Sequence, residues 1–151
     1  PEAQTDRFLL KIKVGYPSFE EEKEIVDRYA DVLKEHRLKT MLNKNHLLSL
    51  QNLTRQVPIA NDIKIRALKI ITATRTNKDV IHYGASPRAS IGILLASKAR
   101  ALIKGRNHVS NEDINEMAYP ILRHRLVLNF EAERKGMTTD DAIKHILDKV
   151  K

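Results

Sequence analysis

The segment from Ser86 to Gly105 constrains the fold more than any other part of this chain. It opens with Ser-Pro, a typical helix start, because serine caps free N–H groups and proline fits the first helical position. It closes at glycine, the residue that most often ends a helix. Apolar residues recur with helical spacing at Ile91, Leu94, Leu95, Ala99, Leu102 and Ile103. We expect this helix to lie at the centre of a single core.

Further segments with helical spacing surround it, at residues 18–33, 46–57, 61–75, 110–118 and 138–150. The first begins with a capping box in which Ser18 stands three residues before Glu21, and Asn61 or Asp62 is expected to cap the third. Pro120 is expected to break or kink the helix that follows Ser110, and it can start another short helix through Arg125. The pattern predicts one all-α domain, a helical bundle.

The N-terminal residues follow a different pattern. Apolar and basic residues alternate from Leu10 to Val14 and end at Gly15-Tyr16-Pro17, which predicts a short strand and a turn. Because one strand is unstable without a sheet, its partners are expected on a segment upstream of Pro1. The chain begins without an initiator methionine, a signal peptide or a membrane span, so we expect a soluble, cytoplasmic fragment of a longer protein.

Composition limits the chemistry. Lys and Arg number 27 against 19 acidic residues, which suggests an anionic partner, although a well-solvated basic surface explains this excess equally well. The chain has no cysteine, and its six histidines show no convincing ligand spacing, so no metal site is expected. It also lacks a Gly-x-x-x-x-Gly-Lys-Ser/Thr loop, a His-Glu-x-x-His pair and a Gly-x-Ser-x-Gly elbow. No active site is therefore predicted within this chain.

One segment, Gly84-Ala85-Ser86-Pro87-Arg88-Ala89, can bind an anion. It places Arg88 in the first turn of a helix, where free N–H groups and a guanidinium can together hold a phosphate. Ala89 stands where an acid would complete a capping box, so no side chain there competes. An ordinary helix start with a solvated arginine fits the local sequence as well. Arg7, in Pro-Glu-Ala-Gln-Thr-Asp-Arg-Phe, carries little information taken locally.

Together these segments resemble the MoxR family of AAA+ ATPases. The resemblance rests on residues 1–8, on Ala73-Thr74-Arg75 with the segment at 84–89, and on Leu122-Arg123-His124-Arg125-Leu126. Thr5 departs from the leucine expected in the first motif. The resemblance implies that residues 1–17 end the AAA+ core, with the arginine-finger helix and the last strand. Residues 18–151 would form the C-terminal helical lid.

The resemblance also implies roles for individual residues. Arg7 corresponds to the arginine finger, which acts in trans on ATP bound by a neighbouring subunit. Arg88, with Ser86, corresponds to sensor-2, which contacts ATP phosphates. If the helix at 46–57 is the insert of related AAA+ groups, Arg88 can act in cis or in trans. Walker A, Walker B and sensor-1 would lie upstream, so this chain alone is expected neither to hydrolyse ATP nor to bind ATP and Mg tightly.

In that family, hexameric rings act as chaperone-like remodellers, often with a von Willebrand factor A domain partner.

Two other interpretations remain. A basic nucleic-acid-binding module is suggested by the net charge and by the helix, loop and helix over residues 101–113, although nucleic acid is the less favoured partner. In a pure interaction scaffold the arginines would only be surface residues. His124 can be interpreted as a catalytic or pH-sensing group, but a structural role at the end of a helix is favoured. Tyr83 can border an adenine pocket, but a core or surface residue is the favoured interpretation.

Overall fold

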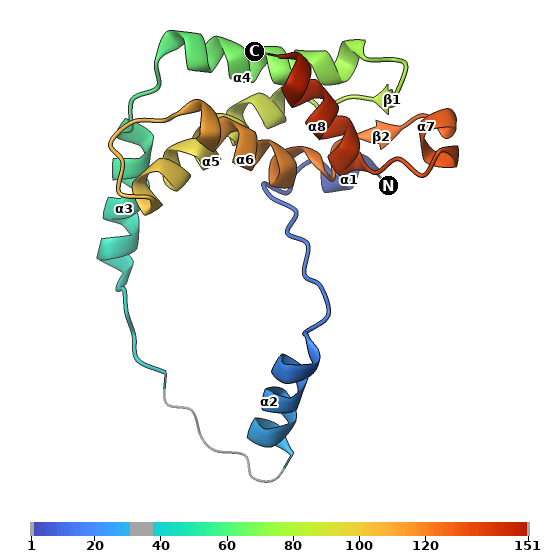
Figure 1. Ribbon diagram of the computed structural model, residues 1–151. Coiled ribbons are helices and arrows are strands. Elements are labelled where there is room, and N and C mark those ends of the chain that lie inside the picture. Colours follow the sequence, from blue (N-terminus) through green and yellow to red (C-terminus); the bar gives the residue numbers. More distant parts are fainter. Residues whose placement is uncertain (1, 31–37, 151) are drawn as a thin grey trace.

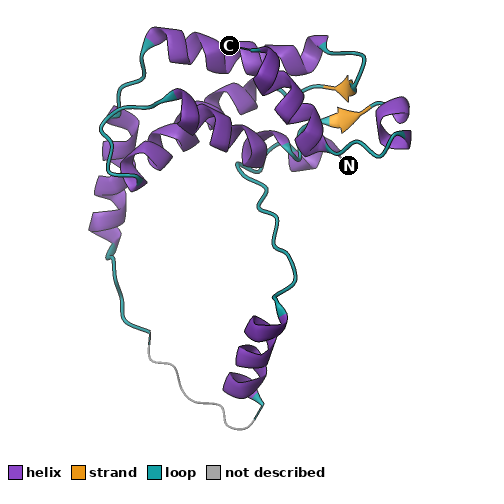
Figure 2. Cartoon of the chain, in the orientation of Figure 1, coloured by secondary structure: helices purple, strands orange, loops and turns teal. Residues whose placement is uncertain are grey.

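The computed structural model describes residues 2–30 and 38–150 and is mainly helical (Figures 1 and 2), which confirms the all-α prediction. Its elements are α1 (Glu2–Thr5), α2 (Phe19–Tyr29), α3 (Lys44–Gln56), α4 (Asn61–Thr76), β1 (Ile81–Tyr83), α5 (Pro87–Ile103), α6 (Asn111–Leu122), β2 (Val127–Leu128), α7 (Phe130–Arg134) and α8 (Thr139–Lys149). Helices α4, α5, α6 and α8 form one body. No helix among these residues has the length and apolarity needed to cross a membrane.

Helix α5 is central, as predicted, since it packs against α3, α4 and α6. Its ends are also as predicted, because Ser86 caps it, Pro87 is its first residue and Gly105 has a positive φ of 70°. The predicted core stripe is partly wrong, however, since Leu94 and Leu102 do pack against the core but Ile91 and Ile103 do not. The buried positions are Ala89, Gly92, Ile93, Ser97 and Ala101, whereas Ile91 is 63% and Ile103 83% exposed.

The small residues explain this difference. A helix face made mainly of alanine, glycine and serine lets neighbouring helices approach closely. The larger side chains of those neighbouring helices then fill the core. Those larger side chains include Ile70, Ile71, Ile114, Ile121, Leu122 and Ile143, all fully buried. Among the bulky side chains of α5, Ile93 is buried and Leu94 and Leu102 are half-buried, whereas Ile91 and Ile103 are left at the surface.

Two local predictions fail at helix ends. Helix α4 is capped by Ala60 without a side-chain hydrogen bond, and Asn61 is its first residue. Helix α6 continues through Pro120 to Leu122, so a break does not occur and no separate helix follows through Arg125, whereas the alternative prediction of a kink stays untested. Pro120 lacks the N–H that would bond the Glu116 carbonyl, and the burial of Ile121 and Leu122 offsets the loss of that one hydrogen bond.

The sequence patterns did not predict the small sheet. Strands β1 and β2 pair antiparallel, with Ile81 opposite Leu128 and Tyr83 opposite Val127. Strands of two or three residues are too short for an alternating pattern to be seen. The pairing is important for the site, because it brings the loop after β1 beside the residues that precede β2.

The strand predicted from Leu10 to Val14 is not formed. Residues 10–18 are irregular, and within the described part of the chain no strand lies beside them. The Lys11 N–H instead donates to the Pro120 carbonyl at 2.8 Å, and the Val14 side chain is 90% exposed. A strand is unstable without a sheet with which to pair, which accounts for the irregular conformation. The expectation that its partners lie upstream of Pro1 stays a prediction. The boundary at residues 17 and 18 stays a prediction.

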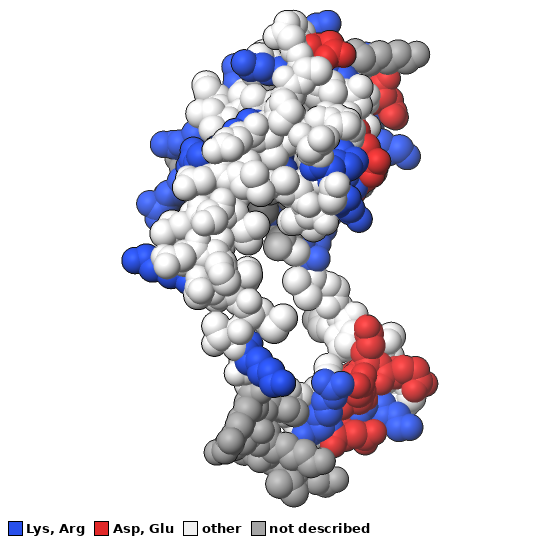
Figure 3. All heavy atoms as spheres, turned by 90° about the vertical axis from the view of Figure 1, so that its left-hand side faces the viewer, with Lys and Arg blue, Asp and Glu red and all other residues white. Residues whose placement is uncertain are grey.

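Helix α2 stands apart from the body (Figure 1), and neither α2 nor α3 has a buried residue. The predicted capping box of Ser18 and Glu21 is present. The predicted apolar positions Val32 and Leu33 lie outside the described residues. Acidic side chains gather on α2 at the lower end of Figure 3, and basic side chains are spread over the body.

Candidate functional site

The loop between β1 and α5 is fixed to the end of α4. A Cβ at Gly84 would lie 2.5 Å from the Thr74 carbonyl oxygen, so a side chain cannot be accommodated there. The Ala85 N–H donates to Thr74 Oγ1 at 3.0 Å, and Arg75 Nε donates to the Ala85 carbonyl at 2.8 Å. The two central sequence motifs thus form one unit, which sets the position of Ser86.

A cavity of about 300 Å³ opens at the start of α5. It is lined by Asp6, Tyr83, Gly84, Ser86, Arg88, His124, Arg125 and Val127. Ser86 Oγ accepts from the Arg88 N–H and donates to the Asp6 carboxylate at 2.9 and 3.0 Å. The Arg88 guanidinium reaches the same carboxylate at 3.2 Å. The structure therefore brings Ser86 and Arg88 together, around a carboxylate.

Burial by itself would raise the pKa of Asp6, but hydrogen bonds from Ser86 and Arg88 outweigh it. They hold the pKa below its ordinary value, so Asp6 is ionised at neutral pH. Donors that stabilise one oxyanion suit a phosphate oxygen as well. Because Arg88 is 67% exposed, its guanidinium is accessible from solvent.

Arg125 is the site residue that sequence reasoning missed. Its buried side chain donates from Nε to the Asp6 carboxylate at 3.1 Å, from Nη2 to the Asp6 carbonyl at 2.9 Å and from Nη1 to the Leu9 carbonyl at 3.2 Å. It also hydrogen-bonds the carbonyls of Phe8 and Ile121. The available signal was its place in the Leu122-Arg123-His124-Arg125-Leu126 motif, which carried the resemblance but suggested no role for Arg125.

Arg7 does not line the cavity. Its side chain is exposed, and its guanidinium lies 6.0 Å from the centre of the Phe8 ring. The backbone on both sides of Arg7 is fixed, because Arg125 holds the carbonyls of Asp6 and Phe8. The structure thus places Arg7 next to the site, on a restrained backbone, and separates it from Ser86 and Arg88.

His124 also contacts this N-terminal segment. Its Nε2 lies 2.9 Å from the Phe8 carbonyl, and its Nδ1 has no hydrogen-bond partner among the described residues. Burial lowers the pKa of His124, which makes the neutral ring with a proton on Nε2 the favoured form. Its carbonyl accepts a hydrogen bond from Thr5 Oγ1 at 3.2 Å. These contacts agree with the structural role expected for it.

A second cluster of charges joins α5 to α6. Asp113 is fully buried and accepts from Arg100 at 2.6 Å, from Arg106 at 2.7 Å and from the Ser110 N–H at 2.9 Å. Burial alone would raise the pKa of Asp113, but hydrogen bonds from Arg106 and Ser110 hold it well below its ordinary value. Arg106, within the helix, loop and helix over residues 101–113, and Arg100, directly before that segment, are therefore both paired with a buried carboxylate.

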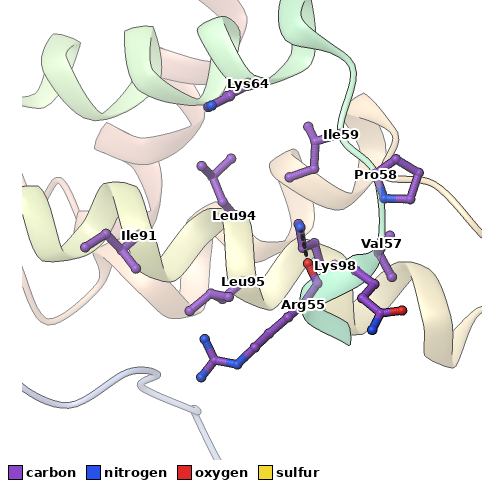
Figure 4. A pocket seen from close by; sticks show the side chains of 10 residues that line it. Arg55, Val57, Pro58, Ile59, Lys64, Ile91, Leu94, Leu95 and Lys98 are labelled. Carbon is purple, nitrogen blue, oxygen red and sulfur yellow. Dashed lines mark hydrogen bonds between the residues drawn. The ribbon is translucent and has the colours of Figure 1, made fainter. Parts of the chain in front are cut away.

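The bulky side chains that α5 leaves at its surface border a groove of about 510 Å³ (Figure 4). It is lined by Arg55, Gln56, Val57, Pro58, Ile59, Lys64, Ile91, Leu94, Leu95 and Lys98. Among the described residues that line it, none is acidic. Lys98 Nζ donates to the Arg55 carbonyl at 2.7 Å, so one of its cations ties α5 to the end of α3.

Comparison with known proteins defines the class of this fold and site. Residues 73–146 match the AAA lid domain family. A crystal structure of a Cytophaga hutchinsonii protein classed as an ATPase superposes on the whole chain with a TM-score of 0.92 and 36% identity, over 48% of that protein. The body of this chain is therefore an AAA lid domain.

Two curated proteins are similar over nearly the whole chain. They are the chaperone MoxR1 of Mycobacterium tuberculosis, at 37% identity over 99% of this chain, and the uncharacterized protein YeaC of Bacillus subtilis, at 34% over 100%. This chain covers 41% of the first and 47% of the second, so it spans less than half the length of these relatives. The chain belongs to the MoxR family of AAA+ ATPases.

Proposed function

We propose that this chain supplies the sensor-2 and arginine-finger residues to ATP hydrolysis in a ring of MoxR-type subunits. The observation that carries the proposal is the cavity at the start of α5. There Ser86 and Arg88 surround a carboxylate with the donors that a phosphate needs. The sequence match to relatives that include a chaperone supports a remodelling activity for the whole protein.

Arg88 and Ser86 would bind ATP phosphates. The Arg88 guanidinium, the Ser86 hydroxyl and the N–H groups of the first turn of α5 are all at one end of the cavity. A phosphate has more charge than a carboxylate and can replace Asp6 as the acceptor. ATP with Mg supplies the phosphoryl group, and the residues of this chain contribute positive charge and orientation to its transfer.

Arg7 would act on the nucleotide of a neighbouring subunit. Its side chain is exposed and outside the cavity that holds Arg88, which fits an action in trans. A positioned guanidinium that stabilises charge on the transferring phosphoryl group contributes about 10³- to 10⁵-fold in rate. This role requires a homo-oligomeric ring, for which a hexamer is the family arrangement.

The upstream nucleotide-binding core would cover the apolar surface of the N-terminal third. The exposed large apolar residues of this region are Phe8, Leu9, Leu10, Ile12, Val14, Tyr16, Phe19, Ile25, Val26, Tyr29, Leu38, Met41, Leu42, Leu47, Leu48, Leu50 and Leu53. A surface this apolar marks an interface. The core would also supply the sheet that Leu10 to Val14 lacks, and a von Willebrand factor A domain protein is a further candidate partner.

The test is ATP turnover by the full-length protein. We expect Arg7→Ala to lower kcat at least about 10³-fold while ATP still binds, and Arg88→Ala to weaken nucleotide binding and lower turnover. Arg134→Ala is the matched control, because Arg134 is an exposed arginine on α7, outside the cavity lining. Unchanged turnover in Arg7→Ala would refute the finger assignment.

Mixed rings decide whether Arg88 acts in cis. Subunits with Arg7→Ala are combined with subunits that carry Arg88→Ala. If Arg88 serves its own nucleotide and Arg7 the neighbour's, some interfaces regain both arginines and turnover partly returns. If Arg7 and Arg88 of one subunit both act on the nucleotide of the neighbouring subunit, every interface lacks one of the two arginines and turnover stays low.

The alternative, a nucleic-acid-binding module, has less support. Arg106 lies in the helix, loop and helix that suggested it, Arg100 directly precedes that segment, and both are paired with Asp113. A salt-sensitive DNA affinity with a steep logarithmic slope would favour this alternative. Binding that is lost near physiological salt would be ordinary attraction to a basic surface.

A further inference from the structure

We propose that Asp6 and Arg125 are positioning residues that couple the two arginines of the proposed function, on which this inference rests. Arg125 would fix the backbone that carries Arg7, and Asp6 would connect that backbone to Arg88. The nucleotide state sensed by Arg88 would then determine how firmly Arg7 is held for the neighbouring subunit.

The first step is the clamp made by Arg125. Its guanidinium donates to carbonyl oxygens of Asp6, Phe8 and Leu9 and to the Asp6 carboxylate. These acceptors surround Arg7 on both sides in sequence. A planar fork with five N–H donors can serve several acceptors at fixed angles, whereas lysine presents a single ammonium group. The clamp therefore requires arginine at position 125.

The second step is the shared carboxylate. Asp6 accepts from Arg125 on one side and from Ser86 and Arg88 on the other. A phosphate that binds Ser86 and Arg88 would compete for these donors and repel the carboxylate. Asp6 would then keep Arg125 as its partner and leave the start of α5. Phosphate binding at Arg88 and the position of Asp6 are thus linked, and this linkage must be reciprocal.

The third step is the adjacency of Asp6 and Arg7 in the sequence. Arg7 directly follows Asp6, so a shift of the Asp6 backbone moves the Cα from which the Arg7 side chain extends. A guanidinium misplaced by about 1 Å from a phosphoryl group can cost about 10²-fold in rate. Small changes in the clamp would therefore alter turnover at the neighbouring site.

The test uses Arg125→Lys and Asp6→Asn in the full-length protein. Arg125→Lys is expected to lower kcat at least about tenfold with little change in the KM for ATP, because the transition state loses a positioned arginine. Asp6→Asn is expected to lower the KM for ATP, because a competing carboxylate is removed, and to lower kcat. Arg123→Lys is the matched control, since Arg123 pairs with Asp140 and does not line the cavity.

A double-mutant cycle separates positioning from general structure. If Arg125 acts through Arg7, the Arg125→Lys change has little further effect on kcat in an Arg7→Ala background. Equal losses of kcat in both backgrounds would show a merely structural role and overturn the proposal. Should Arg125→Lys leave kcat unchanged while Arg7→Ala abolishes turnover, the coupling is wrong and the finger stands. If Arg7→Ala has no effect, the proposed function itself fails.

A second measurement needs no turnover. In this chain, hydrogen exchange reports the Lys11 amide, which donates to the Pro120 carbonyl just beyond the clamp. We expect Arg125→Lys to speed this exchange and Arg134→Lys, at an exposed arginine of α7, to leave it unchanged. Titration with sodium tripolyphosphate should shift the NMR signals of both Arg88 and Arg125 Nε–H groups. A shift confined to Arg88 would contradict the linkage through Asp6.

Discussion

Arg125 Nε and the Asp6 carboxylate are 3.1 Å apart although 119 positions separate the two residues in sequence. Around this ion pair the N-terminal segment is held mainly by charged hydrogen bonds, since Phe8 and Leu9 remain at least half exposed. Leu9 also packs on α5 beside Gly92, but the charged hydrogen bonds around Asp6 make part of the attachment depend on the ionisation of this carboxylate. Its strength should therefore vary with pH.

Acid should release residues 6–9 from the body. The pKa of Asp6 in the folded chain lies below its ordinary value, so the stabilisation is complete at neutral pH. It is lost as pH falls below about 4, through the folded-state pKa. Hydrogen exchange of the Lys11 amide, corrected for the intrinsic effect of pH, should accelerate over this range. In Asp6→Asn the exchange should be fast at every pH, and equal pH profiles in both chains would contradict this prediction.

Gly84→Ala should destabilise the lid. The new Cβ would lie 2.5 Å from the Thr74 carbonyl oxygen, and its nearest neighbours are all backbone atoms of Thr74 and Arg75, which cannot rotate away. We expect a loss of about 1–3 kcal/mol in the free energy of unfolding, measured by urea denaturation. Gly15→Ala is the matched control, because a Cβ there meets nothing within 4 Å. Similar midpoints for the two variants would mean that the loop is not in close contact with α4.

Asp113→Asn should also be strongly destabilising. The change leaves Arg100 and Arg106 without their buried anion, for which about 3 kcal/mol is the expected loss. Glu112→Gln is a suitable control, since Glu112 is an exposed partner of Arg100. Because the pKa of Asp113 is also depressed, its contribution is present at neutral pH and falls in acid below about pH 4. Thermal unfolding of both variants at pH 7 tests this.

Ile25→Lys should leave the stability of the helical body unchanged. Ile25 lies on α2, which has no buried residue, so its replacement removes no core contact in the part of the chain described. The same change should reduce binding of a hydrophobic dye and weaken association with the upstream core. Ile71→Val, in contrast, alters a fully buried residue and should cost about 1 kcal/mol. A large drop in Tm for Ile25→Lys would show that α2 packs on the body.

Helix positions could be predicted from sequence where capping chemistry is local. Ser18 with Glu21, and Ser86 with Pro87, are such cases. The buried face of α5 could not be predicted, because burial depends on the side chains of the neighbouring helices. Small residues such as alanine, glycine and serine also give little signal in a search for apolar periodicity. Arg125 is similar, since its partners are more than a hundred positions away and local sequence cannot show them.

The cluster of Arg100, Arg106 and Asp113 restricts how this lid can evolve. A lineage that loses the acid first must pass through an intermediate with two poorly paired cations at the junction of α5 and α6. Loss of one arginine is milder, because the other still neutralises the carboxylate. Substitutions should therefore accumulate in a fixed order, with an arginine changing before position 113, and homologues with an apolar residue at 113 should lack both basic residues.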